Sequence, residues 1–175
     1  MRVIPGPAHQ LVLLRHAKAE PAGALDDVLR PLALPGRKQA GEVGTGMRAA
    51  GIRPDLVLVS AAVRTRQTWD LVRAGLDVPA DVARVDDAIY EAGVRSLLAL
   101  LREVDESAGT VLVVGHEPTV SQTAAALAGP GSDEAALARV RVGVPTAAYS
   151  VLEVATPWAD LVPDGARLTA VVTPA

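Results

Sequence analysis

The chain has 175 residues, a formal net charge of −3 and no cysteine. This length suits one domain with a sizeable core, and the lack of cysteine excludes disulfides, thiolate metal sites and thiolate catalysis. The slightly acidic balance argues against nucleic-acid binding, and no apolar run is long enough to cross a membrane. Residues 1–10 carry no apolar segment typical of a signal peptide, so we expect a cytoplasmic protein.

The predicted elements alternate between strands and helices after a loose leader. Residues 1–9 are expected to form this flexible leader, with His9 facing solvent, and residues 10–175 a single domain. Short apolar runs predict buried strands, and helical spacing of apolar residues predicts helices. The expected strands span 11–14, 55–60, 83–85, 110–115, 147–154 and 168–172, and the expected helices span 36–50, 62–74, 94–104 and 119–128. This alternation predicts an α/β fold, a three-layer α/β/α sandwich.

The connection between the first strand and the first helix is long and irregular. It runs from Ala17 to Pro35 and contains three prolines. Loops of this length inside a compact domain are usually functional. Asp27 and Arg30 are expected to pair and to fix its conformation. The helix that follows contains several glycines, which predict close packing against the sheet.

Two of the predicted strands lead into a histidine. The strand 11–14 is followed by Arg15-His16, and the strand 110–115 is followed by His116. Such apolar runs are typical of interior strands in a parallel sheet. Parallel sheets carry their ligand sites at the carboxyl ends of the strands. We therefore expect both histidines at one edge of one sheet, where Arg15 and Lys18 would suit an anionic substrate.

A third segment is expected at the same edge. The strand 55–60 is followed by a helix start, with Arg64 about one turn past the strand end. The first N–H groups of a helix lack partners within the helix and attract anions. Two histidines, two arginines and a helix amino end form a set suited to a phosphoryl group that is attacked by an imidazole.

These three segments resemble the three signatures of the histidine phosphatase superfamily, and they occur in the family's order. The matching residues are Arg15-His16, Ser60-x-Ala62-x-Arg64-Thr65-x-Gln67-Thr68 and Gly115-His116. The short chain and the sequence Arg-His-Ala-Lys-Ala resemble the SixA-like phosphohistidine phosphatases, as does Asp27-x-x-Arg30-Pro31-Leu32 followed by Gly36. Two positions depart from the common pattern, Ala33 in place of Thr and Ala61 in place of Pro, and both concern turns rather than catalytic groups.

The resemblance implies a phosphoglycerate mutase-like fold with a mostly parallel central sheet. It also implies that His16 accepts the phosphoryl group and that Arg15, Arg64 and His116 bind the phosphoryl oxygens. The expected enzyme is a phosphatase with a phosphohistidine intermediate. We expect no cofactor and no metal, because cationic side chains neutralise the phosphate and the sequence offers no cluster of carboxylates.

Two glutamates near the predicted site have alternative roles. Glu91 is either a general acid, kept protonated by desolvation in the pocket, or a polar cap before the helix that begins near Val94. Glu117 either orients His116 or caps the following helix, and capping is the preferred interpretation.

Three functions remain open from the sequence. The preferred one is dephosphorylation of phosphohistidine on a protein, because no inserted cap encloses the site and an open site admits a protein side chain. The second is hydrolysis of a small phosphate ester. The third is a non-catalytic domain that binds or senses phosphate, against which the retention of His16 argues, since arginines alone would bind phosphate.

Overall fold

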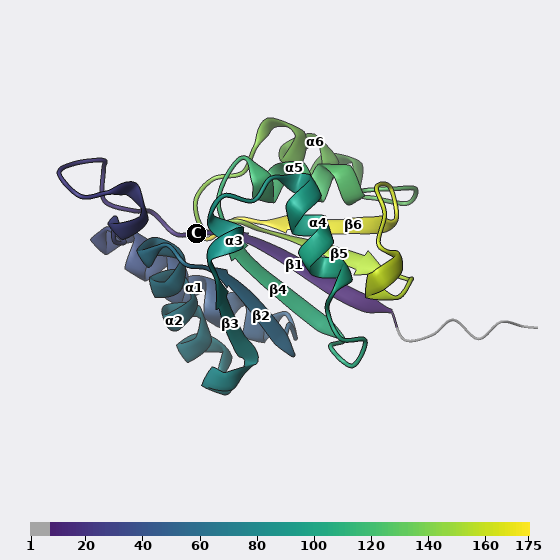
Figure 1. The fold of residues 1–175 in the computed structure, drawn as a ribbon, viewed down its shortest axis with the longest axis horizontal. Helices are drawn as coiled ribbons and strands as arrows, with labels where there is room; N and C mark the ends of the chain where they lie inside the picture. Colours follow the sequence, from purple (N-terminus) through teal and green to yellow (C-terminus); the bar gives the residue numbers. More distant parts are fainter. Residues whose placement is uncertain (1–7) are drawn as a thin grey trace, which may run out of the picture.

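A six-stranded sheet forms the middle layer of the structure, a computed structural model that describes residues 8–175. The strand order is β3-β2-β4-β1-β5-β6. The pairs β1–β4, β2–β4 and β2–β3 are parallel, whereas β5 is antiparallel to both of its neighbours (Figure 1). The strands are β1 (His9–Arg15), β2 (Leu56–Ser60), β3 (Ala83–Asp86), β4 (Thr110–Gly115), β5 (Tyr149–Val154) and β6 (Ala166–Val172).

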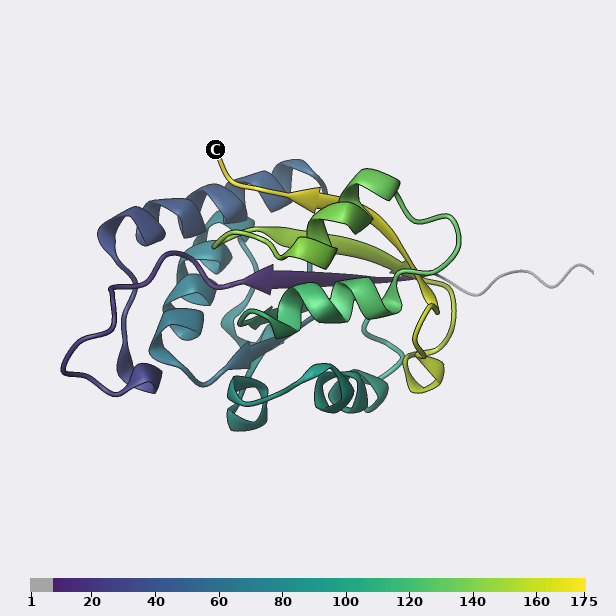
Figure 2. The ribbon, with the colours of Figure 1, turned by 90° about the horizontal axis from the view of Figure 1, so that it is seen from above.

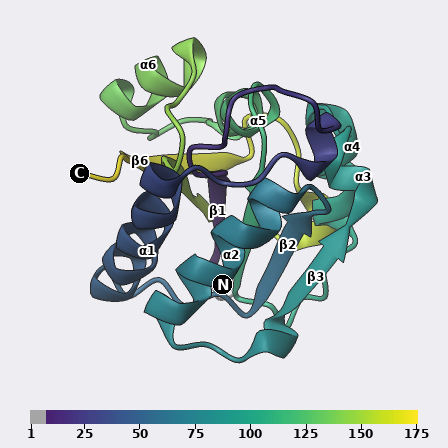
Figure 3. The same ribbon diagram turned by 90° about the vertical axis from the view of Figure 1, so that its left-hand side faces the viewer.

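Helices cover both faces of this sheet. Those in the described chain are α1 (Leu34–Ala49), α2 (Val63–Leu76), α3 (Asp87–Tyr90), α4 (Val94–Arg102), α5 (Thr119–Leu127) and α6 (Glu134–Val142). Short 3-10 turns lie at Asp27–Leu29, Ala80–Val82 and Trp158–Asp160. Figure 3 shows α1 and α2 on one side of the sheet and α5 and α6 on the other. The predicted three-layer α/β/α sandwich is confirmed. The strand at 110–115 has the predicted bounds, and the other nine predicted elements differ by a few residues at one or both ends.

Strand β1 shows why the apolar runs are continuous rather than alternating. Leu11 and Leu13 face the core under α4, α5 and α6, whereas Val12 and Leu14 face the core under α1 and α2. All four side chains are fully buried. A strand with helices on both faces has no polar side, so its sequence reads as an unbroken apolar run.

The expectation that His9 belongs to a solvated leader is wrong. His9 is the first residue of β1 and is buried, and its Nε2 lies 2.9 Å from Oε2 of Glu106. Its ring also lies on Trp158, with 4.9 Å between the ring centroids. Strand β1 therefore begins within the predicted leader, of which residues 1–7 lie outside the described residues.

One glycine of α1, Gly44, serves a contact with α2 rather than the sheet packing that the sequence suggested. A Cβ on Gly44 would lie 2.3 Å from the carbonyl oxygen of Val72, and a Cβ on Gly75 would lie 2.8 Å from the carbonyl carbon of Gly44. Because these two glycines have no Cβ atom, α1 and α2 can approach each other closely. A Cβ on Gly41 or Gly46 would meet nothing within 4 Å.

None of the helices in the described range is long and apolar enough to span a bilayer.

Candidate active site

His16 and His116 lie side by side at one edge of the sheet, as the sequence predicts. The parallel register of β1 and β4 pairs Arg15 with Gly115, so the two residues that follow emerge together. The centroids of the two imidazole rings are 5.4 Å apart, with 56° between the ring planes. Figure 1 shows β1 and β4 as neighbours in the centre of the sheet.

His16 is held in the form that a nucleophile needs. Its Nδ1 lies 2.7 Å from the carbonyl oxygen of Ala17, and since a carbonyl only accepts, Nδ1 carries the proton and Nε2 keeps its lone pair. The pKa of His16 is lowered to about 4, mainly by burial and further by the positive charges of Arg64, Arg15 and Arg30, against the opposing effect of the Ala17 bond. The ring is therefore neutral at pH 7.

His116 is neutral as well, and a serine contacts it. Burial, followed by the charges of Arg64 and His16, lowers the pKa of His116 to about 3. The hydroxyl of Ser60 lies 2.7 Å from Nε2, and Ser60 Oγ also accepts a long hydrogen bond of 3.5 Å from the N–H of Ala62. The Ser60 hydroxyl can thus donate to Nε2, which leaves the proton of the neutral ring on Nδ1.

Several buried donors near His16 have no hydrogen-bond partner among the described residues. They are Nε of Arg15, Nε of Arg64, Nε of Arg30 and Nδ1 of His116. Buried polar groups are almost always paired, so such a group needs an explanation. The three arginines are near enough for their charges to lower the pKa of His16. The arrangement can receive the oxygens of a tetrahedral anion beside Nε2 of His16.

The other nitrogens of the two predicted arginines bind the protein itself. Arg15 donates from Nη1 to the carbonyl oxygen of Val144 at 2.8 Å. Arg64 is 5% exposed and donates from Nη1 to the carbonyl oxygen of Asp27 at 2.7 Å and from Nη2 to its carboxylate at 2.9 Å. Both guanidinium groups are therefore fixed before any substrate arrives.

Asp27 joins the long loop to the site, which the sequence did not reveal. The predicted pair with Arg30 is confirmed, at 3.0 Å. In addition, the carboxylate of Asp27 accepts hydrogen bonds from Arg64 and, at 2.6 Å, from the hydroxyl of Tyr90. The rings of Tyr90 and His116 also lie edge to face, with 5.5 Å between the ring centroids and 82° between the ring planes. The spacing of these residues along the chain carries no signal of this contact.

Glu91 follows the last residue of α3 and is exposed. It lines a cavity of about 220 Å³ together with Tyr90 and His116. Its alternative role as a cap of the next helix is wrong, because Gly93 is the N-cap of α4 and the side chain of Ser96 accepts from the N–H of Gly93.

Glu117 caps α5, in agreement with the preferred interpretation. Its Oε1 accepts from the N–H of Ser121 at 2.8 Å, and its Oε2 accepts from the hydroxyl of Ser121 at 2.6 Å. Lys18 is exposed, and its backbone N–H donates to Gln39. None of these hydrogen bonds involves His16 or His116.

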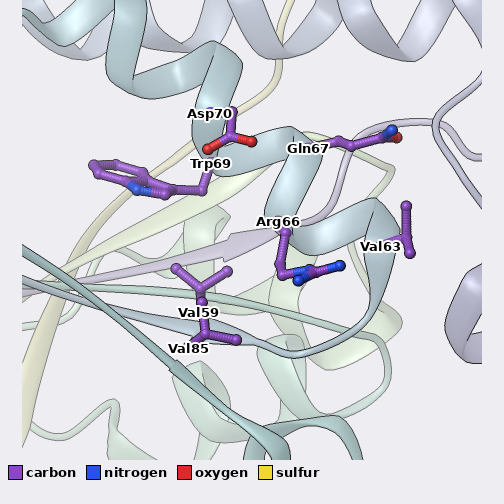
Figure 4. Close-up of a pocket in the computed structure, with 7 residues that line it drawn as sticks. All are labelled: Val59, Val63, Arg66, Gln67, Trp69, Asp70 and Val85. Atoms are coloured by element: carbon purple, nitrogen blue, oxygen red, sulfur yellow. The ribbon is translucent and has the colours of Figure 1, made fainter. Parts of the chain in front are cut away.

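A larger cavity of about 450 Å³ lies elsewhere, between α2 and the edge strand β3. Figure 4 shows Arg66, Trp69 and Asp70 among the residues around it. No histidine lines this cavity. Size alone therefore does not identify the site, and the paired histidines do. Within residues 8–175 no group of three or more His, Asp or Glu residues is placed to hold a metal ion.

The lowered pKa values predict how activity depends on pH. An imidazole can attack only when it is unprotonated, so if His16 is the nucleophile, the loss of activity in acid should be centred near pH 4 rather than near the ordinary histidine value of 6.5. A profile of kcat/KM against pH, measured with an aryl phosphate of known ionisation, tests this expectation. An additional protonation near pH 6.5 that stops the enzyme and is not due to the substrate would contradict it.

Known proteins resemble this chain in sequence and in fold. No family model matches the chain. An uncharacterized protein of Mycobacterium tuberculosis is 40% identical over 156 residues, which cover 89% of this chain and 96% of that protein. A solved structure from Nakamurella multipartitia, described as a candidate phosphohistidine phosphatase SixA, is 36% identical with a TM-score of 0.83 and covers 97% of this chain and 98% of its own.

A second solved structure, from Agrobacterium tumefaciens and also described as a candidate SixA, is 30% identical with a TM-score of 0.79, covering 95% of this chain and 98% of its own. Both matches span nearly the whole of each chain, so they include the strand ends and the loops that carry His16, Arg64 and His116. By these relatives and by the three signatures, the chain belongs to the histidine phosphatase superfamily and is a SixA-like phosphatase.

Proposed function

We propose that this phosphatase removes the phosphoryl group from phosphohistidine side chains of proteins, through a phosphohistidine formed on its own His16. The observation that carries the proposal is the neutral ring of His16, whose Nε2 keeps its lone pair beside unpartnered buried donors. Arginines alone would bind phosphate, and an imidazole held in this tautomer adds a nucleophile.

In the proposed reaction, Nε2 of His16 attacks phosphorus and the bond from phosphorus to the substrate breaks. Nε of Arg15, Nε of Arg64 and Nδ1–H of His116 donate to the phosphoryl oxygens, where negative charge gathers in the transition state. Water then attacks the phosphohistidine on His16 and releases phosphate. No step requires a metal, because arginine side chains supply the positive charge.

The preference for a protein substrate rests on access to the site and on the relatives. The long loop between β1 and α1 extends beyond the end of the sheet (Figure 2) and is tied to Arg64 through Asp27. We expect an imidazole on a protein surface to approach His16 beside this loop. The names of the two similar solved structures point to the same substrate class.

A substrate panel tests the proposal. The kcat/KM for a phosphohistidine-containing protein should exceed the values for sugar phosphates and for an aryl phosphate, and His16→Ala should turn over none of them. A higher kcat/KM for a sugar phosphate would favour hydrolysis of a small phosphate ester as the function. Binding of phosphate without turnover of any substrate would indicate the phosphate-binding domain instead.

The position of Glu91 allows a separate test of the alternative function, hydrolysis of a small phosphate ester. An alkyl phosphate has a poor leaving group and needs a proton, and Glu91 shares a cavity with His116. We expect Glu91→Gln to lower kcat/KM for an alkyl phosphate by about a hundredfold or more, the lower end of the contribution of a general acid, and to leave phosphohistidine hydrolysis much less affected. Glu103→Gln, at an exposed position after α4, is the matched control. An equal fall with both substrates would remove Glu91 from the role of general acid.

A further inference from the structure

The carboxylate of Asp27 accepts hydrogen bonds from two arginines and a tyrosine at the edge of the site. Oδ2 accepts from Nη2 of Arg64 at 2.9 Å and from the hydroxyl of Tyr90 at 2.6 Å, and Oδ1 accepts from Nη2 of Arg30 at 3.0 Å. These bonds, that of Tyr90 foremost, hold the pKa of Asp27 well below its usual range. Asp27 is therefore ionised at neutral pH, cannot deliver a proton and repels any negative charge that develops near it.

The carboxylate lies on the outer side of the donor set. Arg64 is buried and turns its terminal nitrogens to Asp27, whereas its Nε remains without a partner in the described structure. The side chain of Asp27 is 52% exposed. Tyr90 connects the carboxylate to the ring of His116. The charge of Asp27 also acts on the ring of His116, where it opposes the lowering of the His116 pKa. We therefore expect the leaving group of a phosphoryl held beside the two histidines to come near this carboxylate.

We infer that Asp27 selects the leaving group, because its carboxylate accepts a hydrogen bond from the N–H of a protonated phosphoimidazole and repels a departing oxyanion. This inference rests on the proposed function and explains how the site would prefer phosphohistidine to a phosphate ester. It assigns Asp27 a role in specificity in addition to its contact with Arg64.

A protonated phosphoimidazole releases a neutral leaving group. Nε2 of His16 forms a bond to phosphorus, the substrate's P–N bond breaks, and its electron pair stays on the departing ring nitrogen. The proton on the other ring nitrogen remains in place, so the leaving group is a neutral imidazole. An ester whose leaving oxygen receives no proton, such as p-nitrophenyl phosphate, would release an oxyanion, whose negative charge would face the carboxylate.

The ratio of two kcat/KM values, for a phosphohistidine-containing protein and for p-nitrophenyl phosphate, tests this inference in Asp27→Asn. The ratio does not depend on how much of a preparation is folded. The asparagine keeps an oxygen for Arg64, and the backbone carbonyl that binds Nη1 is unchanged. We expect the ratio to fall at least about tenfold, the scale of one hydrogen bond to a charged group.

Tyr90→Phe is the matched control, because it removes a donor to the same carboxylate oxygen and leaves the charge in place. Its ratio should stay within about twofold of the wild-type ratio, on the scale of a neutral hydrogen bond that affects both substrates alike. If Asp27→Asn lowers both values by the same factor, Asp27 only positions Arg64 and the inference is overturned while the proposed function stands. If the wild-type protein does not turn over phosphohistidine, the proposed function fails, and the inference fails with it.

Discussion

His16→Ala should lose turnover by at least about 10⁴-fold, since removal of a covalent nucleophile leaves only what binding and oxyanion donors contribute. The alanine has no atom that can form a bond to phosphorus, and no other imidazole replaces it: Nε2 of His116 is engaged by Ser60. The measurement is steady-state hydrolysis of an aryl phosphate and of a phosphohistidine-containing protein.

His9→Ala is the matched control for this variant. His9 is the first residue of β1, the strand that ends just before His16. It lies at the far end of the strand from the site, against Glu106 and Trp158. The control should lower the thermal midpoint through lost packing and keep kcat of the folded protein. Comparable losses of kcat in both variants would contradict the assignment of His16.

Arg64→Ala should cost roughly 3 kcal/mol or more of transition-state stabilisation, which is more than about a hundredfold in kcat/KM. The variant removes the buried Nε donor and one positive charge beside His16. Arg15→Ala should have an effect of similar size, because Nε of Arg15 is also buried without a partner in the part of the chain that the structure describes.

Arg66→Ala, two residues along the same helix and exposed, is the matched control and should be close to neutral. The thermal midpoint of Arg64→Ala should change little, since Asp27 is half exposed and keeps Arg30 and Tyr90 as partners. Equal losses of kcat/KM for Arg64→Ala and Arg66→Ala would show that the wrong arginine has been assigned.

The parts of the fold that the sequence predicted are those with strong local patterns. Buried strands such as β1 and β4 are unbroken apolar runs, and α4 carries an apolar stripe on one face, so each could be read without knowledge of its neighbours. Helix α6 was not predicted: only Ala136 and Val140 are buried in it, so its apolar periodicity is weak. A local signal existed in Asp133, whose side chain accepts from the N–H of Ala136 as an N-cap.

The same limit applies to the site. His16, Arg64 and His116 could be placed from the sequence because each follows a strand whose carboxyl end is predictable. The contacts that tune them could not. Ser60 meets His116 across 56 residues, and Tyr90 meets Asp27 across 63 residues. Such pairs depend on strand order and loop path, which local patterns do not specify.

The most direct test of this account is to trap the intermediate. The enzyme is mixed with excess substrate, quenched in base within a single turnover, and the protein-bound phosphate is located by mass spectrometry and by NMR of the phosphorylated ring. The account predicts a base-stable, acid-labile phosphate on Nε2 of His16, since Nδ1 donates to Ala17. Phosphate on another residue, or rapid turnover without any phosphorylated protein, would contradict it.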